Sequence, residues 1–391
     1  RCRKMIAKEK LNILWSLEQT AEKYADRVAV SDVNQELTWK ELVKKAQVIG
    51  AELSEKVQPG NPVPVLLEKS SETLAVMLGI VYAGCFYVPV NPMNPTERLR
   101  KIMEKLDPEV IISDEKGKEQ LAAVGNGLEN KVMGPEALTT ATGTELSEEQ
   151  YSRLEQIQGQ WKETDVLYGI FTSGSTGTPK AIVVSHGAAS RFIRHFTEIF
   201  EITSADVIGN QAPFDFDVSV KDIYSSIMTG AQLVLIPKEY FSTPPRLLDY
   251  LCDKKVTNLT WAVSALTLVS ALKGLNYRVP ESVKRVMFSG EAMPAKQLRI
   301  WQEKLPEAKF VNLYGPTEIT CNCTYFPIER QYEDSEKIPA GKAFPGRRVI
   351  LVDEEGKQVV YRGKSARQEN LWQMAIIKNL SRQRRSLCCI L

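Results

Sequence analysis

Thr172-Ser-Gly-Ser-Thr-Gly-Thr-Pro-Lys180 is the most informative stretch of this chain. It lies between two apolar runs, Val166–Phe171 and Ile182–Val184, so the pattern predicts a strand, a flexible loop and a second strand. Backbone N–H groups and hydroxyls of such a loop can close around phosphate oxygens, while Lys180 supplies positive charge. It is not a Walker loop, because the G-x-x-x-x-G-K-[ST] spacing is absent. The alternative is a Ser/Gly linker, but linkers rarely lie between two buried strand patterns.

Composition narrows the class of protein. The chain has 391 residues, of which 43% are hydrophobic and 25% charged, as in soluble globular proteins of two or three domains or subdomains. A formal net charge of +2 gives no reason to expect nucleic acid as a partner. The two histidines, His186 and His195, make a mechanism based on histidine general bases unexpected. The seven cysteines are scattered, and Cys321-x-Cys323 has the wrong spacing for a zinc site, which favours a reducing, cytoplasmic setting.

One uncharged stretch is long enough to raise the question of a membrane span. Thr73–Val90 contains eighteen residues without a charge. Gly84 and the segment after it, which ends at Pro89, favour a buried helix, a tight turn and a short strand instead. We therefore expect no membrane span, and no signal peptide is visible at the N-terminus.

Strand-like and helical patterns alternate along the chain. Thr38-x-x-Glu41 predicts a capping box that opens a helix, and Phe192–Phe200 predicts an amphipathic helix whose aromatic side chains lie in the core. Strands are predicted at Val63–Leu67, Leu233–Ile236, Val286–Phe288 and Phe310–Leu313. Lys116–Gln160, which is polar and rich in glutamate, reads as a solvated excursion. The alternation predicts an α/β fold with mainly parallel sheets.

Two further motifs turn the loop into a candidate site. Asn312-Leu-Tyr-Gly-Pro-Thr-Glu318 follows a predicted strand and combines an aromatic face for a base, a glycine turn, a hydroxyl and a carboxylate. Phe214-Asp-Phe-Asp-Val-Ser-Val220 sets Asp217 inside an apolar segment. A buried, unpaired carboxylate is costly, so we expect Asp217 to have a cationic partner.

With these motifs in order, the sequence resembles the adenylate-forming (AMP-binding) superfamily. Within it, the similarity is to the adenylation domains of nonribosomal peptide synthetases and to the D-alanine–carrier protein ligases. The motifs that carry the resemblance are Tyr82–Val90, Thr172–Lys180, Phe214–Val220, Phe288-Ser-Gly-Glu291 and Asn312–Glu318. The resemblance implies a large N-terminal domain with two mainly parallel sheets flanked by helices, plus an incomplete β-barrel subdomain.

The resemblance also implies roles for individual residues. Lys180, Thr317 and Glu318 would be catalytic, with Thr317 on the α-phosphate and Glu318 on Mg²⁺. Tyr314 would stack on adenine, beside Asn312 and Gly290. The ATP-binding set would be Thr172, Ser173, Gly174, Ser175, Thr176, Gly177, Lys180, Gly290, Asn312, Leu313, Tyr314, Gly315, Pro316 and Thr317. Asp217 would pair with the substrate's α-ammonium, and the side-chain pocket would be lined by Val218, Lys221, Thr260, Met287, Ser289, Leu313, Cys321 and Asn322.

The implied reaction suits these residue types. An amino acid's carboxylate attacks the α-phosphorus of ATP, pyrophosphate leaves, and an aminoacyl-adenylate forms. Cations and oriented donors lower the barrier, so no histidine base is needed. The phosphopantetheine thiol of a carrier protein would then take the acyl group. The alternatives are an acyl- or aryl-CoA synthetase of the same superfamily, whose substrate needs no Asp217, and a non-catalytic nucleotide-binding protein.

The resemblance runs from about Leu14 to Val360, so we expect an AMP-binding domain over residues 5–360 and an aberrant tail over residues 361–391. The tail lacks the ribose-binding Asp and the C-terminal subdomain of the family. One shifted reading frame permits family-like segments there, so we expect a frameshift near Tyr361 and little or no activity in this chain. The terminal Cys388-Cys-Ile-Leu391, which matches a prenylation box, would then be accidental, and Met5 is a plausible start.

Overall fold

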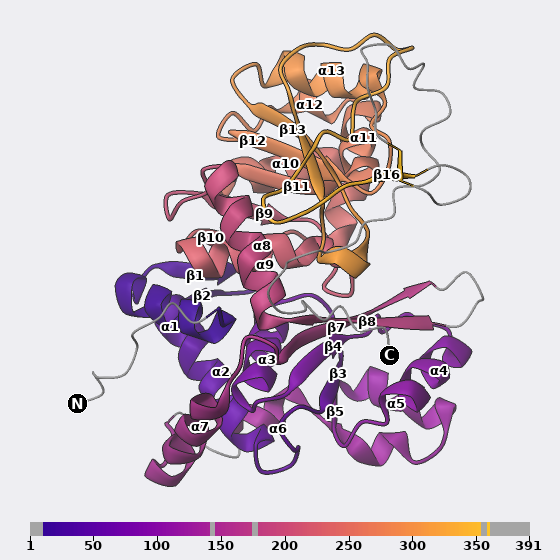
Figure 1. Ribbon diagram of the computed structural model, residues 1–391. Helices are drawn as coiled ribbons and strands as arrows, with labels where there is room; N and C mark the ends of the chain where they lie inside the picture. The colour runs from indigo at the N-terminus through magenta and orange to yellow at the C-terminus, as the bar shows by residue number, and fades with distance from the viewer. Residues whose placement is uncertain (1–10, 141–144, 174–178, 353–357, 360–391) are drawn as a thin grey trace.

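Two sheets, each built mainly from parallel strands, organise the molecule (Figure 1). The computed structural model describes residues 11–140, 145–173, 179–352 and 358–359. Within these ranges, six strands form one sheet in the order β6-β5-β3-β4-β7-β8. Their bounds are β3 Pro62–Leu66, β4 Phe86–Pro89, β5 Ile111–Ser113, β6 Val132–Met133, β7 Val166–Ser173 and β8 Pro179–Ser185. The strands run parallel except β8, which pairs antiparallel with β7.

The second sheet has nine strands among the described residues, in the order β15-β14-β13-β12-β11-β9-β10-β1-β2. Its strands are β1 Val28–Ser31, β2 Glu36–Thr38, β9 Val207–Asn210, β10 Gln232–Leu235, β11 Asn258–Ala262, β12 Arg285–Ser289, β13 Lys309–Tyr314, β14 Thr324–Ile328 and β15 Lys342–Ala343. From β1 to β13 the neighbours are parallel, and β2, β14 and β15 add antiparallel edges. β16 (Leu351–Val352) and β17 (Gln358–Val359) pair separately. The predicted α/β class with mainly parallel sheets is confirmed.

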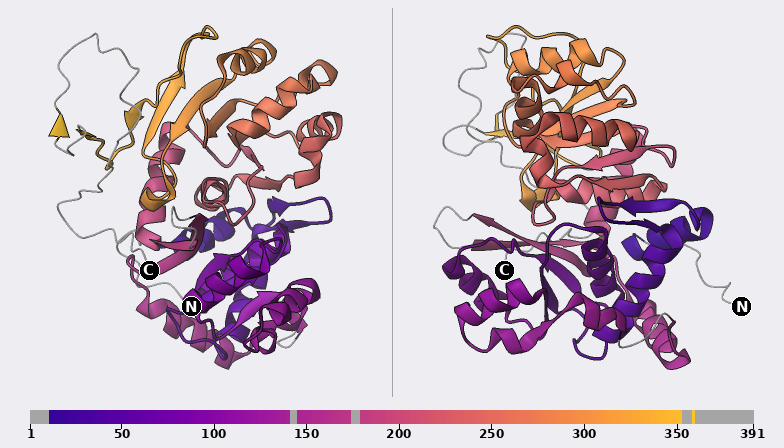
Figure 2. Two further views of the ribbon diagram at one scale, coloured as in Figure 1. Left: turned by 90° about the vertical axis from the view of Figure 1, so that its right-hand side faces the viewer. Right: turned by 180° about the vertical axis from the view of Figure 1, so that it is seen from behind.

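Helices cover both faces of both sheets. They are α1 Ile13–Tyr24, α2 Trp39–Leu53, α3 Ser71–Tyr82, α4 Thr96–Leu106, α5 Glu115–Val124, α6 Pro135–Thr140, α7 Glu148–Gln160, α8 His186–Ile199, α9 Val218–Thr229, α10 Pro244–Asp253, α11 Val263–Ala271, α12 Gly274–Tyr277 and α13 Ala295–Lys304, with short 3-10 turns η1 Leu128–Lys131, η2 Lys238–Ser242 and η3 Thr317–Ile319. The largest hydrophobic cluster joins α1, α2, α3, α8 and α9 to strands of both sheets. Two smaller clusters lie on the outer faces, under α10, α11 and α13 and under α4 and α5. The sheets therefore enclose a shared helical layer, as the side and rear views also show (Figure 2).

Local patterns account for several of these elements. The predicted capping box is present, because Thr38 and Glu41 exchange side-chain and backbone hydrogen bonds at the start of α2. The uncharged stretch Thr73–Val90 forms most of α3, a turn at Gly84 with φ of 76° and then β4, which confirms the prediction. α3 is buried on all sides, which explains its lack of an amphipathic pattern. In the described ranges, no helix is both long enough and apolar enough to cross a membrane.

The predicted excursion Lys116–Gln160 is largely solvated, since most of its described residues are exposed or half-buried, but it also contains regular structure that the sequence did not reveal. The segment contains most of α5 and all of η1, β6, α6 and α7, apart from residues outside the described ranges. Leu121 and Leu128 join one outer cluster, while Leu138 and Leu154 join the central cluster. Each short helix is held by one or two leucines, too few to give a periodic pattern in a polar sequence, so tertiary packing overrides composition.

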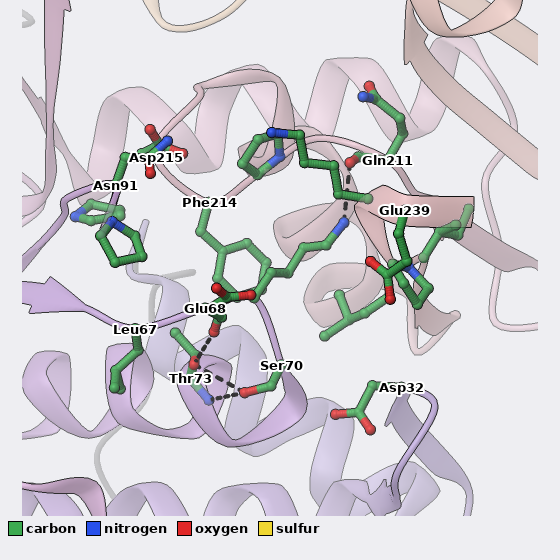
Figure 3. A pocket seen from close by; sticks show the side chains of 18 of the residues that line it. Asp32, Leu67, Glu68, Ser70, Thr73, Asn91, Gln211, Phe214, Asp215 and Glu239 are labelled. Atoms are coloured by element: carbon green, nitrogen blue, oxygen red, sulfur yellow. Dashed lines mark hydrogen bonds between the residues drawn. The ribbon is translucent and has the colours of Figure 1, made fainter. Parts of the chain in front are cut away.

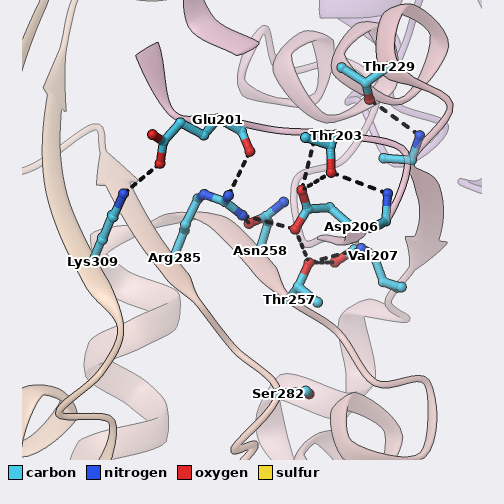
Figure 4. Close-up of polar contacts among 12 residues, drawn as sticks. Glu201, Thr203, Asp206, Val207, Thr229, Thr257, Asn258, Ser282, Arg285 and Lys309 are labelled. Carbon is cyan, nitrogen blue, oxygen red and sulfur yellow. Dashed lines mark hydrogen bonds and ion pairs between the residues drawn. The ribbon is translucent and has the colours of Figure 1, made fainter. Parts of the chain in front are cut away.

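A polar network ties together the amino ends of the parallel strands β9, β11, β12 and β13 (Figure 4). Arg285 Nη1 lies 2.9 Å from Asp206 Oδ1 and 2.8 Å from Asn258 Oδ1. Asp206 also accepts hydrogen bonds from the Thr203 N–H and the Thr257 hydroxyl. These hydrogen bonds, with the charge of Arg285, lower the pKa of Asp206 even though burial opposes them. The network holds the amino edge of the sheet, and the candidate site lies at the opposite, carboxyl edge.

Candidate active site

The predicted phosphate loop is the tip of an antiparallel hairpin. In the pairing of β7 with β8, Thr172 lies opposite Lys180 and Ser173 opposite Pro179. The strands thus extend further than predicted, and Thr172, Ser173 and Lys180 belong to them. The predicted ligands Gly174, Ser175, Thr176 and Gly177 lie outside the described residues. The described part of the hairpin presents Lys180, with its side chain about one-third exposed, near the tip.

Lys180 brings the hairpin to the Asn312–Glu318 motif. Its Nζ lies 3.9 Å from Glu318 Oε1, and the two side chains are 37% and 39% exposed. Glu318 lies in η3, which follows β13 at the carboxyl edge of the nine-stranded sheet. An exposed pair at this distance contributes little to stability, about 0–1 kcal/mol. Both side chains can therefore take other partners, and their charges suit a phosphate and a cation respectively.

Asp217 joins the same site from a third segment. It directly precedes α9 and is partly exposed, and its carboxyl accepts a hydrogen bond from the Thr317 side chain. Burial raises the pKa of Asp217, while the charge of Lys221 and the Thr317 hydrogen bond oppose the rise and nearby Glu318 adds to it. The expected cationic neighbour is therefore Lys221. No ion pair within 4.0 Å joins Asp217 to a lysine or arginine of the described residues, so the carboxylate retains capacity for a cationic ligand.

Lys221 and Asp222 are consecutive residues of α9, both buried, and the charge of Lys221 acts on Asp217. Lys221 is 1% exposed, and its Nζ donates a hydrogen bond of 2.6 Å to Asn322 Oδ1. Asp222 is also 1% exposed and accepts a hydrogen bond of 2.9 Å from Asn210 Nδ2. Burial raises the pKa of Asp222 to about 7, although Lys221 and Lys69 both lower it. Sequence reasoning missed Asp222. A carboxylate next to a lysine inside the apolar helix pattern of α9 was the signal that could have revealed it.

The other predicted pocket residues gather around this pair. Thr260 on β11 lies opposite Met287 on β12, and Ser289 follows on the same face of β12 two residues later. Met287 and Leu313 belong to the cluster that contains the apolar side chains of α9, so this face of the sheet is covered by that helix. The structure thus brings together Asp217, Val218, Lys221, Thr260, Met287, Ser289, Leu313, Cys321 and Asn322.

The loop between β13 and β14 closes the site. Its residues Thr320 and Cys321 both adopt left-handed backbone conformations, with φ of 65° and 68°. The Cys321 thiol donates to the Asp217 carbonyl, and the Cys323 N–H donates to the Tyr314 carbonyl over 2.8 Å. Arg347 donates to backbone carbonyls at Ile319 and Thr320, a contact that sequence reasoning missed. Such strained, well-anchored backbone is typical of functional loops.

The residues expected to contact adenine lie at the same edge. Tyr314 ends β13 and is 47% exposed, so its ring face is available for stacking. Gly290, directly after β12, has φ of 98° and open space around it. The Asn312 amide donates to the Pro339 carbonyl over 2.8 Å, so this side chain also anchors the neighbouring segment.

The donor set fits magnesium only together with phosphates. Among the described residues, no group of three histidine, cysteine or acidic side chains could hold a metal ion. Mg²⁺ is commonly bound by one or two carboxylates plus substrate phosphate oxygens and water. Glu318, partly exposed beside Lys180, supplies one such carboxylate.

Comparison with known proteins places this geometry in a family. The sequence matches the family described as AMP-binding enzyme over residues 17–366. The chain belongs to this family. It is 30% identical over 348 residues to the D-alanine--D-alanyl carrier protein ligase of Staphylococcus epidermidis, covering 88% of this chain and 67% of the ligase. It is 31% identical over 339 residues to tyrocidine synthase 3 of Brevibacillus parabrevis, covering 86% of this chain and 5% of the synthase.

A solved structure confirms the fold of this AMP-binding enzyme. The nonribosomal peptide synthetase FmoA3, in its AMPPNP-bound form, superimposes with a TM-score of 0.77 at 24% identity. The match covers 90% of this chain and 36% of the FmoA3 chain. The predicted membership of the adenylate-forming superfamily, with synthetase adenylation domains and D-alanine–carrier protein ligases as relatives, is confirmed. The predicted domain boundary near residue 360 and the tail lie outside the described residues.

Proposed function

We propose that this chain carries the site for ATP-dependent activation of an amino acid as an aminoacyl-adenylate, with release of pyrophosphate. The activated acyl group would pass to the phosphopantetheine thiol of a carrier protein, in the cytoplasm. The observation that carries the proposal is the convergence of three distant segments. Lys180 lies beside Glu318, and Thr317, the neighbour of Glu318, contacts Asp217.

Each side chain has a task that suits its chemistry. Lys180 would neutralise phosphate oxygens of ATP, and Glu318 would hold Mg²⁺, which supplies charge neutralisation to the phosphates when bound. The present contact of Lys180 with Glu318 would then be replaced by contacts of each with the nucleotide and its metal. The Thr317 hydroxyl would donate to the α-phosphate, where negative charge develops during the attack of the carboxylate.

Asp217 gives the site its preference for amino acids. Its carboxylate is partly desolvated, which strengthens its attraction for a cation, and no described lysine or arginine forms a close ion pair with it. An α-ammonium group would complete this arrangement. A simple fatty or aryl acid has no such charge, so the acyl- or aryl-CoA synthetase reading leaves Asp217 without a partner.

A binding experiment tests this assignment without requiring turnover. Two non-hydrolysable adenylate analogues would be titrated into the chain, one with an aminoacyl group and one with the matching acyl group that lacks the amine. Asp217→Ala should weaken binding of the aminoacyl analogue by roughly 10- to 100-fold, because it removes a charged hydrogen bond worth about 1.5–3 kcal/mol. The same substitution should change the affinity for the acyl analogue by less than twofold.

Asp215→Ala is the matched control, because Asp215 lies on the same loop but lines a different cavity. The role of Asp217 would be contradicted if Asp217→Ala weakened binding of both analogues equally, or if Asp215→Ala weakened binding of the aminoacyl analogue as much as Asp217→Ala does. Because this chain is expected to have little or no activity, an exchange assay between pyrophosphate and ATP would then be run across the amino acids on the frame-corrected protein, to identify the substrate. If ATP binds but neither analogue does, the chain is a nucleotide-binding protein of another kind.

A further inference from the structure

A cavity of about 800 Å³ lies between the two sheets, apart from the candidate active site (Figure 3). We call it the inter-sheet cavity. Its walls come from segments that follow strands of both sheets, including Leu67 after β3 and Ile236 after β10. Gln211, Phe214 and Asp215, on the loop that leads to Asp217, form another wall. Lys180, Asp217 and Glu318 do not line it. Its volume and its position between layers are those of small-molecule sites.

Most of the inter-sheet cavity is apolar. Buried side chains of Val65, Val90, Phe214, Ile236 and Phe241 line it. Three apolar side chains that also line it, Val33, Met93 and Leu268, are 50%, 69% and 39% exposed. Exposed apolar groups around a concave site gain free energy when a hydrocarbon chain covers them. The occupant should therefore have an aliphatic part.

Lys69 supplies a cation in this apolar setting. Its Nζ donates to the carbonyls of Asn210 and Gln211, over 3.2 Å and 3.1 Å. An ammonium has three N–H donors, so one remains. Among the described residues, no carboxylate lies within 4.0 Å of this Nζ. Burial lowers the pKa of Lys69 to about 8, although Asp222 and Glu239 oppose the shift. The cation is thus incompletely compensated, which favours a bound anion.

Four acidic side chains of the described ranges line the inter-sheet cavity: Asp32, Glu68, Asp215 and Glu239. Burial raises the pKa of Asp215, and its carboxyl already has the Asn91 side chain as a hydrogen-bond partner and the charges of Arg98 and Lys238 nearby. Asp32 is saturated, because its oxygens accept from Ser71 and from the N–H groups of Asn34 and Gln35. Glu68 and Glu239 are exposed, so water screens their charges. A bound ammonium would also be repelled by Lys69.

We propose that the inter-sheet cavity binds a small aliphatic monocarboxylate, with its carboxylate on the Lys69 ammonium and its hydrocarbon chain along the apolar walls. The site is distinct from the candidate active site and does not depend on the proposed function. The remaining N–H donor of Lys69 meets a carboxylate oxygen, and the exposed Val33, Met93 and Leu268 cover the chain.

Calorimetric titration of the full chain at pH 7 with hexanoate, hexylammonium and hexanol tests the proposal. Hexanoate should bind at least tenfold more tightly than either of the others. Lys69→Met should weaken hexanoate binding at least tenfold, whereas Lys69→Arg should keep most of the affinity of the unaltered chain. Lys238→Met, which removes an exposed cation from the same cavity, should change it less than twofold.

Lys180→Met distinguishes the inter-sheet cavity from the candidate active site. If hexanoate bound in the candidate active site instead, its binding would be lost in Lys180→Met and kept in Lys69→Met. That result would overturn the proposal, as would absence of measurable hexanoate binding or a preference for hexylammonium. The three-ligand comparison on the unaltered chain stands even if a Lys69 variant fails to fold, which thermal unfolding would show.

Discussion

Gly315→Ala would test whether backbone packing behind the loop from Thr317 to Asn322 holds the candidate active site together. Gly315 follows β13 and lies against that loop. A Cβ at this position would lie 2.5 Å from Asn322 Cα, 2.7 Å from the Cys323 nitrogen and 2.8 Å from the Cys321 oxygen. All three neighbours are backbone atoms, so no side-chain rotation relieves the clash.

The size of the effect follows from these distances. Ordinary contact begins at 3.4 Å, so Asn322 Cα must retreat by about 0.9 Å. The hydrogen bond of 2.6 Å from Lys221 to Asn322 would lengthen toward the limit at which such bonds lose their strength. Overpacking of this kind costs about 1–3 kcal/mol in stability. A displacement near 1 Å in a binding site can cost about 10²-fold, so we expect the aminoacyl-adenylate analogue to bind 10- to 100-fold more weakly.

Calorimetric titration with that analogue, beside urea unfolding, measures both effects. Gly346→Ala is the control, since Gly346 has no atom within 4 Å of the added carbon and, unlike Gly315, has a positive φ, 74°. It should lose about 1–2 kcal/mol through left-handed strain while binding the analogue normally. If Gly315→Ala binds the analogue within twofold of the unaltered chain, the loop does not position the site and the reasoning fails.

Three further predictions concern charge, stability and stacking. Burial raises the pKa of Asp222 to about 7, above the unfolded value near 3.9, so the folded protein holds the extra proton between these pH values. The contribution of Asp222 to stability therefore falls as pH rises from about 4 to about 7, by up to about 1.4 kcal/mol per pH unit. Urea unfolding over this pH range should show that fall in the unaltered chain, and the part due to Asp222 should be absent in Asp222→Asn. Asp206→Ala should lower the free energy of unfolding by about 3–5 kcal/mol in the same assay, because it leaves Arg285, 11% exposed, without its buried partner. Lys309→Met, which removes an exposed ion pair, is the control and should cost at most about 1 kcal/mol. Tyr314→Ala should weaken ATP binding by about 1–3 kcal/mol in an equilibrium titration, whereas Tyr314→Phe should bind ATP normally because the ring remains. Equal losses of ATP affinity in the two variants would exclude stacking.

Much of the fold was predictable from local patterns. The capping box at Thr38, the helix and turn within Thr73–Val90 and the strands around the phosphate loop all appear as expected. Their signals depend on spacing within a few residues. The helices of Lys116–Gln160 were not predictable in the same way, because single leucines such as Leu121 hold them against distant strands.

For the candidate active site, the three motifs and their order were enough to indicate phosphate, base and ammonium chemistry. The roles assigned to individual residues stay predictions. Asp222 and Arg347 escaped notice because neither lies in a motif, and their importance comes from what surrounds them. Lys69, a single charge before a helix cap, likewise has meaning only once both sheets enclose it.

The order of residues along the chain was sufficient to predict alternating strands and helices, since backbone conformation and side-chain periodicity are local properties. It also located Thr172–Lys180 and Asn312–Glu318 as chemically active segments. Only the folded chain shows Lys180 beside Glu318 and Thr317 in contact with Asp217. Asp217 and Thr317 meet because β9 and β13 are strands of the same parallel arrangement, which brings their carboxyl ends to one edge of the nine-stranded sheet. Lys180 lies on the β7–β8 hairpin of the other sheet, so its place beside Glu318 depends on how the two sheets pack together. Burial and neighbouring charges, which shift the pKa values of Asp217, Asp222 and Lys69, exist only after that assembly.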